Sequence, residues 1–205
     1  MGVESICGCN HAVRAIEVAA FGGHTVTFIG SPESQAEKLA YELNYTARFA
    51  QKQVGIPDAE RTCGYAWSPC PCGNYGDPAF ECTCTPELIA EYCAADPMPL
   101  TDMYIRVPRP RYDVVMRWAR AGFKYGETTD DLLKRMERAW EEGGPVEGVD
   151  ESAWALLRAA VRQLHMQPKT VKRTVGVAKT IATLAGARKI EAAHMAEAIQ
   201  YRPRP

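Results

Sequence analysis

Two Cys-x-Cys pairs lie close together near the middle of the chain, and no other feature limits the possible fold as strongly. Nine residues rich in Gly, Pro, Asn and Asp separate the first pair, Cys70 and Cys72, from the second pair, Cys82 and Cys84. Four thiolates at this spacing can complete a tetrahedron around Zn²⁺, which favours sulfur ligands and stabilises loops too short to have a hydrophobic core. The sequence therefore predicts a structural zinc knuckle over residues 70–84, with these four cysteines as its ligands.

Disulfide bonds are the alternative use of the eight cysteines. The N-terminal residues include neither a basic region nor an apolar stretch, so no secretory signal is expected. The chain also contains no apolar run near the ~20 residues that a membrane span requires. In a reducing cytoplasm, clustered Cys-x-Cys pairs are typical of metal ligands rather than of disulfides. We therefore predict a cytoplasmic protein that has no membrane partner and holds zinc.

The other cysteines are predicted to have simpler roles. Cys7 and Cys9 form a third Cys-x-Cys pair, but two further ligands are missing, which favours free or buried thiols over a second metal site. Cys63 is near enough in sequence to replace a knuckle ligand. Cys93 is expected to pack along the helix that follows the knuckle.

Hydrophobic patterning predicts alternating helices and strands in the first half of the chain. Helices are expected over 10–21, from about 35 to 54 and over 86–94, and strands over 25–29, 65–67 and 103–107. Asn10 and Thr85 are the expected N-caps, and Pro86 suits the first position of a helix. Alternation of this kind indicates an α/β fold.

The second half is predicted to be helical. Helices are expected from Thr128 or Thr129 to about 140, from Asp150 to about 164, over 169–185 and over 191–201. A Gly-Gly-Pro linker at 143–145 separates the first two, and Pro168 separates the next two. The segment contains no internal repeat.

Aromatic residues and histidines outside the knuckle are interpreted as structural. Three tryptophans at helical spacing are predicted to be core residues: Trp118, Trp140 and Trp154. His194 is expected to cap or pack at the start of the last helix. No partner is predicted for His11 or His165.

Several segments together carry a resemblance to a known family. Segment 12–42 contains a helix with Arg14 and Glu17, the turn Gly22-Gly23-His24, a hydrophobic strand and Gly30. Further motifs lie at 69–86, which contains the cysteine pairs, at 126–135 and at 177–202. These residues resemble the magnesium-chelatase-like AAA+ ATPases, the family of the chelatase motor subunit and of the competence-associated branch-migration helicase. The resemblance covers nearly the whole chain.

The resemblance implies a reduced AAA+ (P-loop-like) fold with three layers. Residues 1–125 would form the core, with a small parallel sheet and the zinc knuckle, and residues 126–205 a helical lid-like domain. The family has two further strands and their helices where this chain has only residues 55–64. Because those strands form one edge of the family's sheet, the expected order of the others is 102–107, 26–29, 64–67.

The segment that resembles the phosphate-binding loop lacks the residues that bind phosphate. It consists of Gly30, Ser31, Pro32, Glu33, Ser34, Gln35, Ala36 and Glu37. In the family, glycines occupy the positions of Glu33 and Gln35. A lysine occupies the position of Ala36, and a Mg²⁺-binding hydroxyl that of Glu37. The glutamates would repel a triphosphate, so the resemblance implies a degenerate loop.

Other elements of ATP chemistry are missing from the sequence as well. It contains no hydrophobic run ending in Asp-Glu to hold Mg²⁺, and no arginine between Pro97 and Asp102. Lys169 is the best match to the lid arginine that contacts the γ-phosphate. The resemblance therefore implies that ATP is not a cofactor and that the chain does not hydrolyse it.

Charge is distributed unevenly, although the net charge is only −1. Segment 106–124 has six Lys/Arg and one Asp, segment 127–151 has nine acids and three bases, and the residues from 165 onward have eight Lys/Arg and two Glu. Such blocks can bind nucleic acid or the opposite charge of a partner. The chain lacks the overall basic excess of nucleic-acid binders, which favours solvated helix faces.

The predicted function is a catalytically inactive, zinc-binding AAA+ scaffold or adaptor. A protein partner is expected for a pseudo-ATPase of this kind, and a related active AAA+ ATPase is a candidate. Two alternatives stay open: an accessory protein that binds nucleic acid through 106–124 and 165–205, and residual ATP binding without hydrolysis. Salt-dependent retention on DNA would separate the first alternative from the scaffold.

Overall fold

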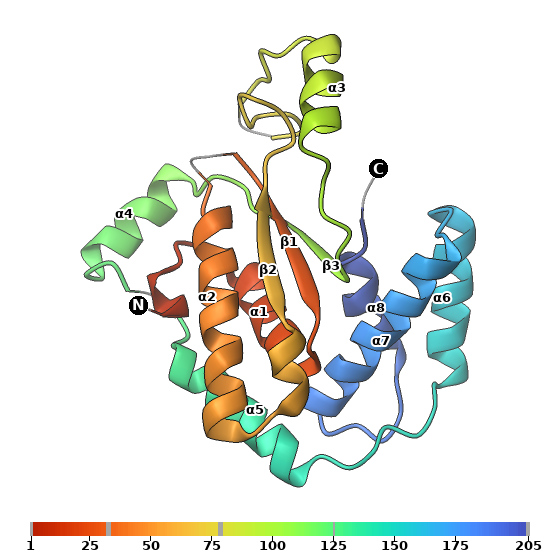
Figure 1. Ribbon diagram of the computed structural model, residues 1–205. Coiled ribbons are helices and arrows are strands. Elements are labelled where there is room, and N and C mark those ends of the chain that lie inside the picture. The colour runs from red at the N-terminus through yellow and green to blue at the C-terminus, as the bar shows by residue number, and fades with distance from the viewer. Residues whose placement is uncertain (1, 32–33, 78–79, 125, 204–205) are drawn as a thin grey trace.

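A three-stranded parallel sheet forms the centre of the molecule (Figure 1). The computed structural model describes residues 2–31, 34–77, 80–124 and 126–203. β1 (Thr25–Ile29) lies between β2 (Cys63–Trp67) and β3 (Met103–Arg106), and both outer strands run parallel to it. The predicted strand order and direction are confirmed.

Two helices of the first half pack against the sheet and against each other. α1 (Asn10–Gly22) contacts α2 (Ala36–Phe49), and α2 covers β1 and β2. The middle residues of β1 are fully buried, as expected of a parallel strand covered on both faces. Gly64 of β2 allows a close approach to α2, because a Cβ at this position would lie 2.9 Å from the carbonyl oxygen of Ala40.

β2 forms an open edge of the sheet within the described ranges. On this edge the N–H group of Gly64 donates to Oδ1 of Asn44 at 3.0 Å. The strand is only five residues long. Short edges with partly occupied hydrogen-bonding groups resist pairing with other chains. The reduced sheet can therefore exist without its missing strands.

The start of α1 differs from the prediction. Cys9, not Asn10, is the N-cap, and its thiol makes no capping hydrogen bond. Val3, Ile6 and Cys9 are buried, so the packing of the preceding segment, rather than a polar cap, determines where α1 begins. At its other end α1 stops at Gly23, whose φ of 67° is the left-handed conformation that favours glycine.

The predicted continuation of α2 to about residue 54 is confirmed, with a wider final turn. A π-helical segment, η2 (Ala50–Val54), follows α2 directly and stops at Gly55, whose φ is 80°. A 3₁₀ segment, η3 (Pro57–Arg61), then leads into β2.

The cysteine knuckle and α3 (Pro86–Ala95) project from the main body beyond the ends of the strands (Figure 1). The side chain of Thr85 accepts a hydrogen bond from the N–H group of Leu88, and Pro86 occupies the first turn, so both predictions for this helix start are confirmed. Nε1 of Trp67, at the end of β2, donates to the carbonyl of Asp96 at 2.9 Å. This bond anchors the projection to the sheet.

The sequence does not predict α4 (Tyr112–Arg120), which lies beside the N-terminal segment (Figure 1). Prolines precede it, and none of its residues is buried, so neither its start nor a strong core pattern is visible in the sequence. Val114 packs where a side chain on Gly8 would be. The arginines at both ends of α4 face solvent.

Four helices make up most of residues 126–203: α5 (Thr129–Glu142), α6 (Glu151–Gln163), α7 (Pro168–Leu184) and α8 (Ala192–Gln200). Thr128 and Asp131 form a capping box at the start of α5. α6 and α7 pack on α8, while α1 contacts α5 and α7. One hydrophobic core therefore extends through both halves, and a domain boundary at 125/126 stays a prediction. Along the described chain, no helix is both long enough and apolar enough to span a membrane.

The predicted core role of the tryptophans is wrong. Trp140 and Trp154 are 46% and 40% exposed, because α5 and α6 bury other faces. Trp140 meets Phe21 edge-on, with ring centroids 6.4 Å apart. Trp118 is half-buried and packs edge-on against Phe123 at 5.0 Å.

The prediction for His194 is confirmed, and that for His11 is wrong. Nδ1 of His194 accepts a hydrogen bond from the N–H group of Glu191, which confirms its predicted capping role. His11 has a partner that the sequence does not predict, since its Nε2 lies 3.0 Å from the carbonyl oxygen of Arg106.

Candidate metal centre and phosphate loop

The four knuckle cysteines converge on one point. The Sγ atom of Cys70 lies 3.4 Å from that of Cys72 and 3.7 Å from that of Cys82, and the Cys72 and Cys82 sulfurs are 3.6 Å apart. All four sulfurs, including that of Cys84, lie within 4.8 Å of one another. A regular tetrahedron with metal–sulfur bonds of ~2.3 Å has sulfurs about 3.8 Å apart. The cluster can therefore hold a metal ion.

Backbone hydrogen bonds shape the first half of this cluster. The N–H group of Gly73 donates to the carbonyl of Cys70 at 2.9 Å, and the N–H group of Tyr75 points at the Cys70 sulfur at 3.4 Å. Gly73 has a φ of 75°, which permits the tight turn immediately after the Cys-x-Cys pair. The local sequence thus positions the first pair of sulfurs before any metal binds.

The electrostatics of the cluster favour a bound cation. N–H groups, first that of Asn74 and then that of Thr83, lower the pKa of the Cys72 thiol to about 6. The N–H group of Cys84 also lowers the pKa of the Cys82 thiol. Desolvation and the neighbouring thiols outweigh this effect and raise that pKa to about 12. Four thiolates this close repel one another, and a divalent cation removes that repulsion.

The other cysteines lie outside this cluster. Cys63 is in β2 and does not replace a ligand. The thiol of Cys93 lies 3.7 Å from the carbonyl of Pro69 and so holds α3 beside the knuckle. Cys7 and Cys9 are buried free thiols, as predicted, and burial raises the pKa of Cys9 to about 11.

The phosphate-loop segment folds back on itself. Pro32 and Glu33 lie outside the described residues. The N–H group of Ser34 donates to the carbonyl of Ser31 at 2.8 Å, and the Ser34 hydroxyl accepts from the N–H group of Ala36 at 3.3 Å. A side chain on Gly30 would collide with that hydroxyl and with the carbonyl of Val107.

The start of α2 is bound to the N-terminal segment. The Gln35 carboxamide pairs with the backbone of Cys7, since its Oε1 accepts from the N–H group and its Nε2 donates to the carbonyl, each at 2.8 Å. Nζ of Lys38 donates to the carbonyl of Ser5 at 2.5 Å and lies 5.9 Å from the centroid of the Trp118 ring. The cation nearest the loop in sequence is therefore directed away from it.

Arg109 joins the loop to the knuckle, and the sequence does not predict this role. Its Nε donates to the Ser31 hydroxyl at 3.0 Å, and its Nη2 donates to Oδ1 of Asn74 at 2.8 Å. Its guanidinium carbon lies 4.3 Å from the centroid of the Phe80 ring. In the sequence, the feature that points to this role is the place of Arg109 shortly after the strand predicted at 103–107.

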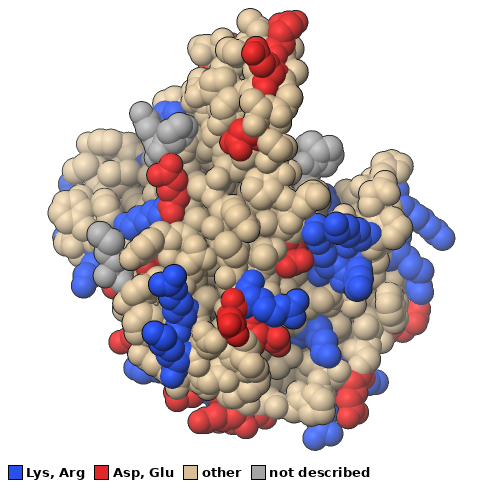
Figure 2. All heavy atoms as spheres, viewed as in Figure 1, with Lys and Arg blue, Asp and Glu red and all other residues tan. Residues whose placement is uncertain are grey.

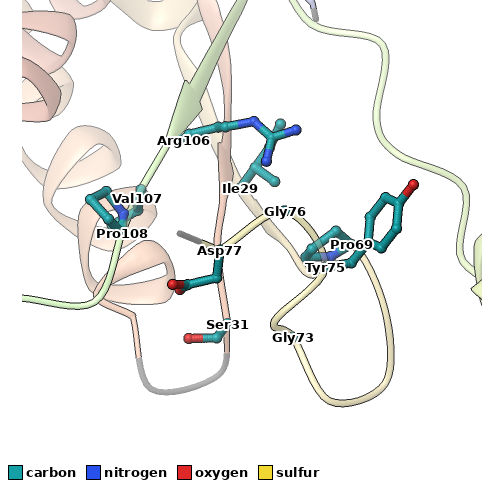
Figure 3. A pocket seen from close by; sticks show the side chains of 11 residues that line it. Ile29, Ser31, Pro69, Gly73, Tyr75, Gly76, Asp77, Arg106, Val107 and Pro108 are labelled. Carbon is teal, nitrogen blue, oxygen red and sulfur yellow. The ribbon is translucent and has the colours of Figure 1, made fainter. Parts of the chain in front are cut away.

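A cavity of about 220 Å³ lies between the loop, the knuckle turn and the end of β3 (Figure 3). Gly30 and Ser31 line it from the loop, and Gly76 and Asp77 from the knuckle. Arg106 reaches across it toward Gly76 (Figure 3). Ligands of parallel α/β sheets bind at this place, beyond the carboxyl ends of the strands.

A second depression of about 240 Å³, on the other side of the loop, is acidic. Glu37, which is exposed, and Asp96 line it together with Ala36, which is 4% exposed. Lys169, the predicted lid cation, is exposed in the first turn of α7 and lines neither of these two cavities. Among the described loop residues, Glu37 thus brings a carboxylate, and Ala36 stands where the family has a lysine.

Comparisons with known proteins agree with this arrangement. Residues 2–53 and 46–114 match the family model described as magnesium chelatase, subunit ChlI. Residues 126–202 match the model described as the C-terminal part of the same subunit. No curated protein matches the chain in sequence.

Proposed function

The chain belongs to the magnesium chelatase subunit ChlI family, and from this premise we propose that it is a zinc-binding AAA+ scaffold that does not hydrolyse ATP. The observation that carries the proposal is the pairing of Gln35 with the backbone of Cys7. A glycine at position 35 would leave open space beside the loop. Here a carboxamide fills that space and is held by two hydrogen bonds.

Electrostatics at the loop support the same proposal. Phosphoryl transfer requires positive charge that is in place before the reaction begins. The lysine position holds the buried Ala36, the next residue, Glu37, adds a carboxylate, and Lys38 is bound to Ser5. Loss of one stabilising group at an active site typically lowers the rate ~10²–10³-fold. With several such groups replaced, we expect no turnover above background.

Zinc is the proposed metal, with a structural role. Four sulfur donors at tetrahedral separations suit Zn²⁺, and a site whose four positions are all filled by protein has no open position for a substrate. Arg109 connects this centre to Ser31 of the loop. The metal would therefore hold both the knuckle and the loop in one fixed shape.

The proposed partner is a protein, and a related active AAA+ ATPase is the leading candidate. α3 and α4 have no buried residues, although they carry apolar side chains: Leu88 is 44% exposed and Tyr112 is 80% exposed. Helices of this kind can bury their apolar residues against another protein. A cytoplasmic location, where such a partner would be met, stays a prediction.

Nucleic-acid binding is the second candidate, and a cluster of basic side chains favours it. Figure 2 shows Lys and Arg gathered on the side of the molecule formed by α6 and α7. Arg162, Lys169 and Lys172 are exposed there. α4, which contains Arg117 and Arg120, lies on the opposite side of the sheet from α6 and α7 (Figure 1). Retention on DNA that falls steeply with salt, and that is lost in the Lys169→Glu/Lys172→Glu variant, would support this candidate.

Phosphate release from Mg²⁺-ATP tests the main proposal. The native chain is assayed beside the double variant Ala36→Lys/Glu37→Thr, which restores the two missing residue types. The native chain is expected to release phosphate at the rate of the buffer alone. An equilibrium ATP-binding measurement separates the scaffold from the alternative of binding without hydrolysis. Native turnover that disappears on substitution within 30–37 would falsify the proposal.

A further inference from the structure

A larger cavity, of about 470 Å³, lies beside β3. It is bounded by β3, the first turn of α1 and the end of α8, and it shares Ile29, Arg106 and Pro108 with the smaller cavity at the loop. Its volume is within the range of small-molecule sites, which is about 300–1,000 Å³. The metal centre and the described loop residues 30 and 31 and 34–37 do not line it.

The walls of this cavity are apolar, and its charged groups are all basic. Ile29 and Ile105 contribute aliphatic surface, and the largely buried Tyr104 and Tyr201 contribute aromatic rings. The basic groups come from three elements: His11, Arg106 and Arg202. Among the described lining residues there is no Asp or Glu. The cavity therefore combines flat apolar surface with positive charge.

Arg106 is the central cation of this site. It is exposed at the end of β3, and no ion pair or hydrogen bond to its guanidinium is found within the described part of the chain. The knuckle turn approaches it closely, since a Cβ on Gly76 would lie 2.8 Å from Nη1 of Arg106. Guanidinium groups bind carboxylates and phosphates with two parallel hydrogen bonds. Arg106 is thus held at a cavity mouth with its donors available.

The two flanking basic side chains are held by backbone carbonyls. A carbonyl can only accept, so Nε2 of His11 donates to the carbonyl of Arg106 at 3.0 Å, and Nδ1 is the other polar atom of the ring. His11 also lies in the first turn of α1, where the helix dipole favours an anion. Nη1 of Arg202 donates to the carbonyl of Ile199 at 3.0 Å, which fixes its guanidinium at the end of α8.

We propose that this cavity binds a small organic anion, namely a carboxylate or phosphate monoester attached to a flat apolar group. Arg106 binds the anionic group, Arg202 adds positive charge, and the ring of His11 lines the same cavity. The apolar part lies against Ile105 and the tyrosine rings. The site is separate from the phosphate loop, so binding here does not depend on the loss of ATP hydrolysis.

Calorimetric titration of the full-length, metal-loaded protein with phenyl phosphate tests the proposal. Inorganic phosphate supplies the anion without the ring, and phenol the ring without the anion. We expect saturable one-to-one binding of phenyl phosphate that is tighter than that of either fragment. Arg106→Gln should weaken it at least tenfold, about 1.4 kcal/mol. Arg120→Gln removes an exposed arginine of α4 and is the matched control, expected to bind as the native protein does.

Three results would overturn the proposal: no saturable binding of phenyl phosphate, equal weakening by Arg106→Gln and Arg120→Gln, or binding that Arg106→Gln leaves unchanged. Arg106 is exposed, so Arg106→Gln is expected to fold as the native protein does, and a thermal melt of each variant checks this. NMR resonances of the His11 ring that shift with phenyl phosphate would locate the ligand in this cavity. An unshifted His11 ring at saturation would place it elsewhere and count against the site.

Discussion

Oε1 of Glu17 in α1 accepts a hydrogen bond of 2.7 Å from Nε of Arg135 in α5. Glu17 is only 1% exposed, and its second oxygen accepts from Nη1 of Arg14, also at 2.7 Å. Arg14 in turn donates to Glu197 of α8 at 2.9 Å. The hydrogen bond to Glu17 raises the pKa of Arg135 above its ordinary value. One buried carboxylate therefore connects the first helix to the helical second half.

Replacing this carboxylate by an amide should destabilise the protein. Hydrogen bonds to charged groups contribute about 1.5–3 kcal/mol, and the two arginines are partly solvated, so we expect Glu17→Gln to lower the free energy of unfolding by about 2 kcal/mol. Urea unfolding followed by circular dichroism measures the change. Asp113→Asn, which breaks only exposed ion pairs on α4, should change it by less than about 1 kcal/mol. Similar changes in both variants would contradict a special role for Glu17.

The knuckle should contain one zinc ion per chain. Metal analysis of protein purified without chelator should find it, and Cys82→Ser should lose it because three sulfurs cannot complete the tetrahedron. Cys63→Ser is the matched control, since Cys63 lies outside the cluster, and it should keep the metal. Zinc-free native protein with four reactive knuckle thiols would disprove the assignment.

Glu42 should make stability depend on pH. It is fully buried in α2, and within the described ranges neither carboxylate oxygen has a hydrogen-bond partner. Burial raises its pKa above the ordinary 4.5. The unfolded chain therefore ionises first, and the native protein loses stability relative to a neutral variant as the pH rises from about 4.5 through the folded-state pKa.

We therefore expect Glu42→Gln to be more stable than the native chain at pH 8, and this advantage to vanish near pH 4. Thermal or urea unfolding across this range measures the difference. Glu137→Gln, on the exposed face of α5, is the control and should show no such pH-dependent gain. A Glu42→Gln variant that is less stable than the native chain at pH 8 would show that the buried carboxylate is stabilising.

Removal of the metal should loosen the phosphate loop as well as the knuckle. Arg109 binds both Asn74 of the knuckle and Ser31 of the loop, so a disordered knuckle removes its hydrogen bond to Asn74. Hydrogen exchange after treatment with a chelator should increase at 70–77 and also at 30–31, but not in α8. In Arg109→Ala the exchange at 30–31 should already be fast and insensitive to the chelator. Faster exchange confined to the knuckle of the native chain would argue against the link.

The parts of the fold that follow from local sequence could be predicted. β-branched and aromatic residues at 25–29 predict the central strand, Thr85 and Pro86 predict the start of α3, and the cysteine spacing predicts the sulfur cluster. Each of these depends on interactions between residues close in sequence. The order of the strands does not follow from local sequence. It was expected from the family resemblance, which indicates which strands of the family's sheet this chain lacks.

The parts that depend on distant contacts could not be predicted. α4 packs on Gly8 across more than a hundred residues, and Arg109 meets Ser31 and Asn74 only after the sheet has formed. Trp140 has helical spacing, but which face of α5 is buried depends on the position of η2 and α7. Spacing alone does not contain that information.

The position of Gly76 beside Arg106 ties the metal to the proposed anion site thermodynamically. The knuckle turn limits the orientations of the guanidinium, so a folded knuckle lowers the entropy lost when an anion is bound. Coupling free energies between two binding sites are reciprocal. The anion must then increase the affinity of the knuckle for its metal by the same factor by which the metal increases the affinity for the anion. If both sites bind as proposed, the metal and the anion would influence each other through a single guanidinium, that of Arg106.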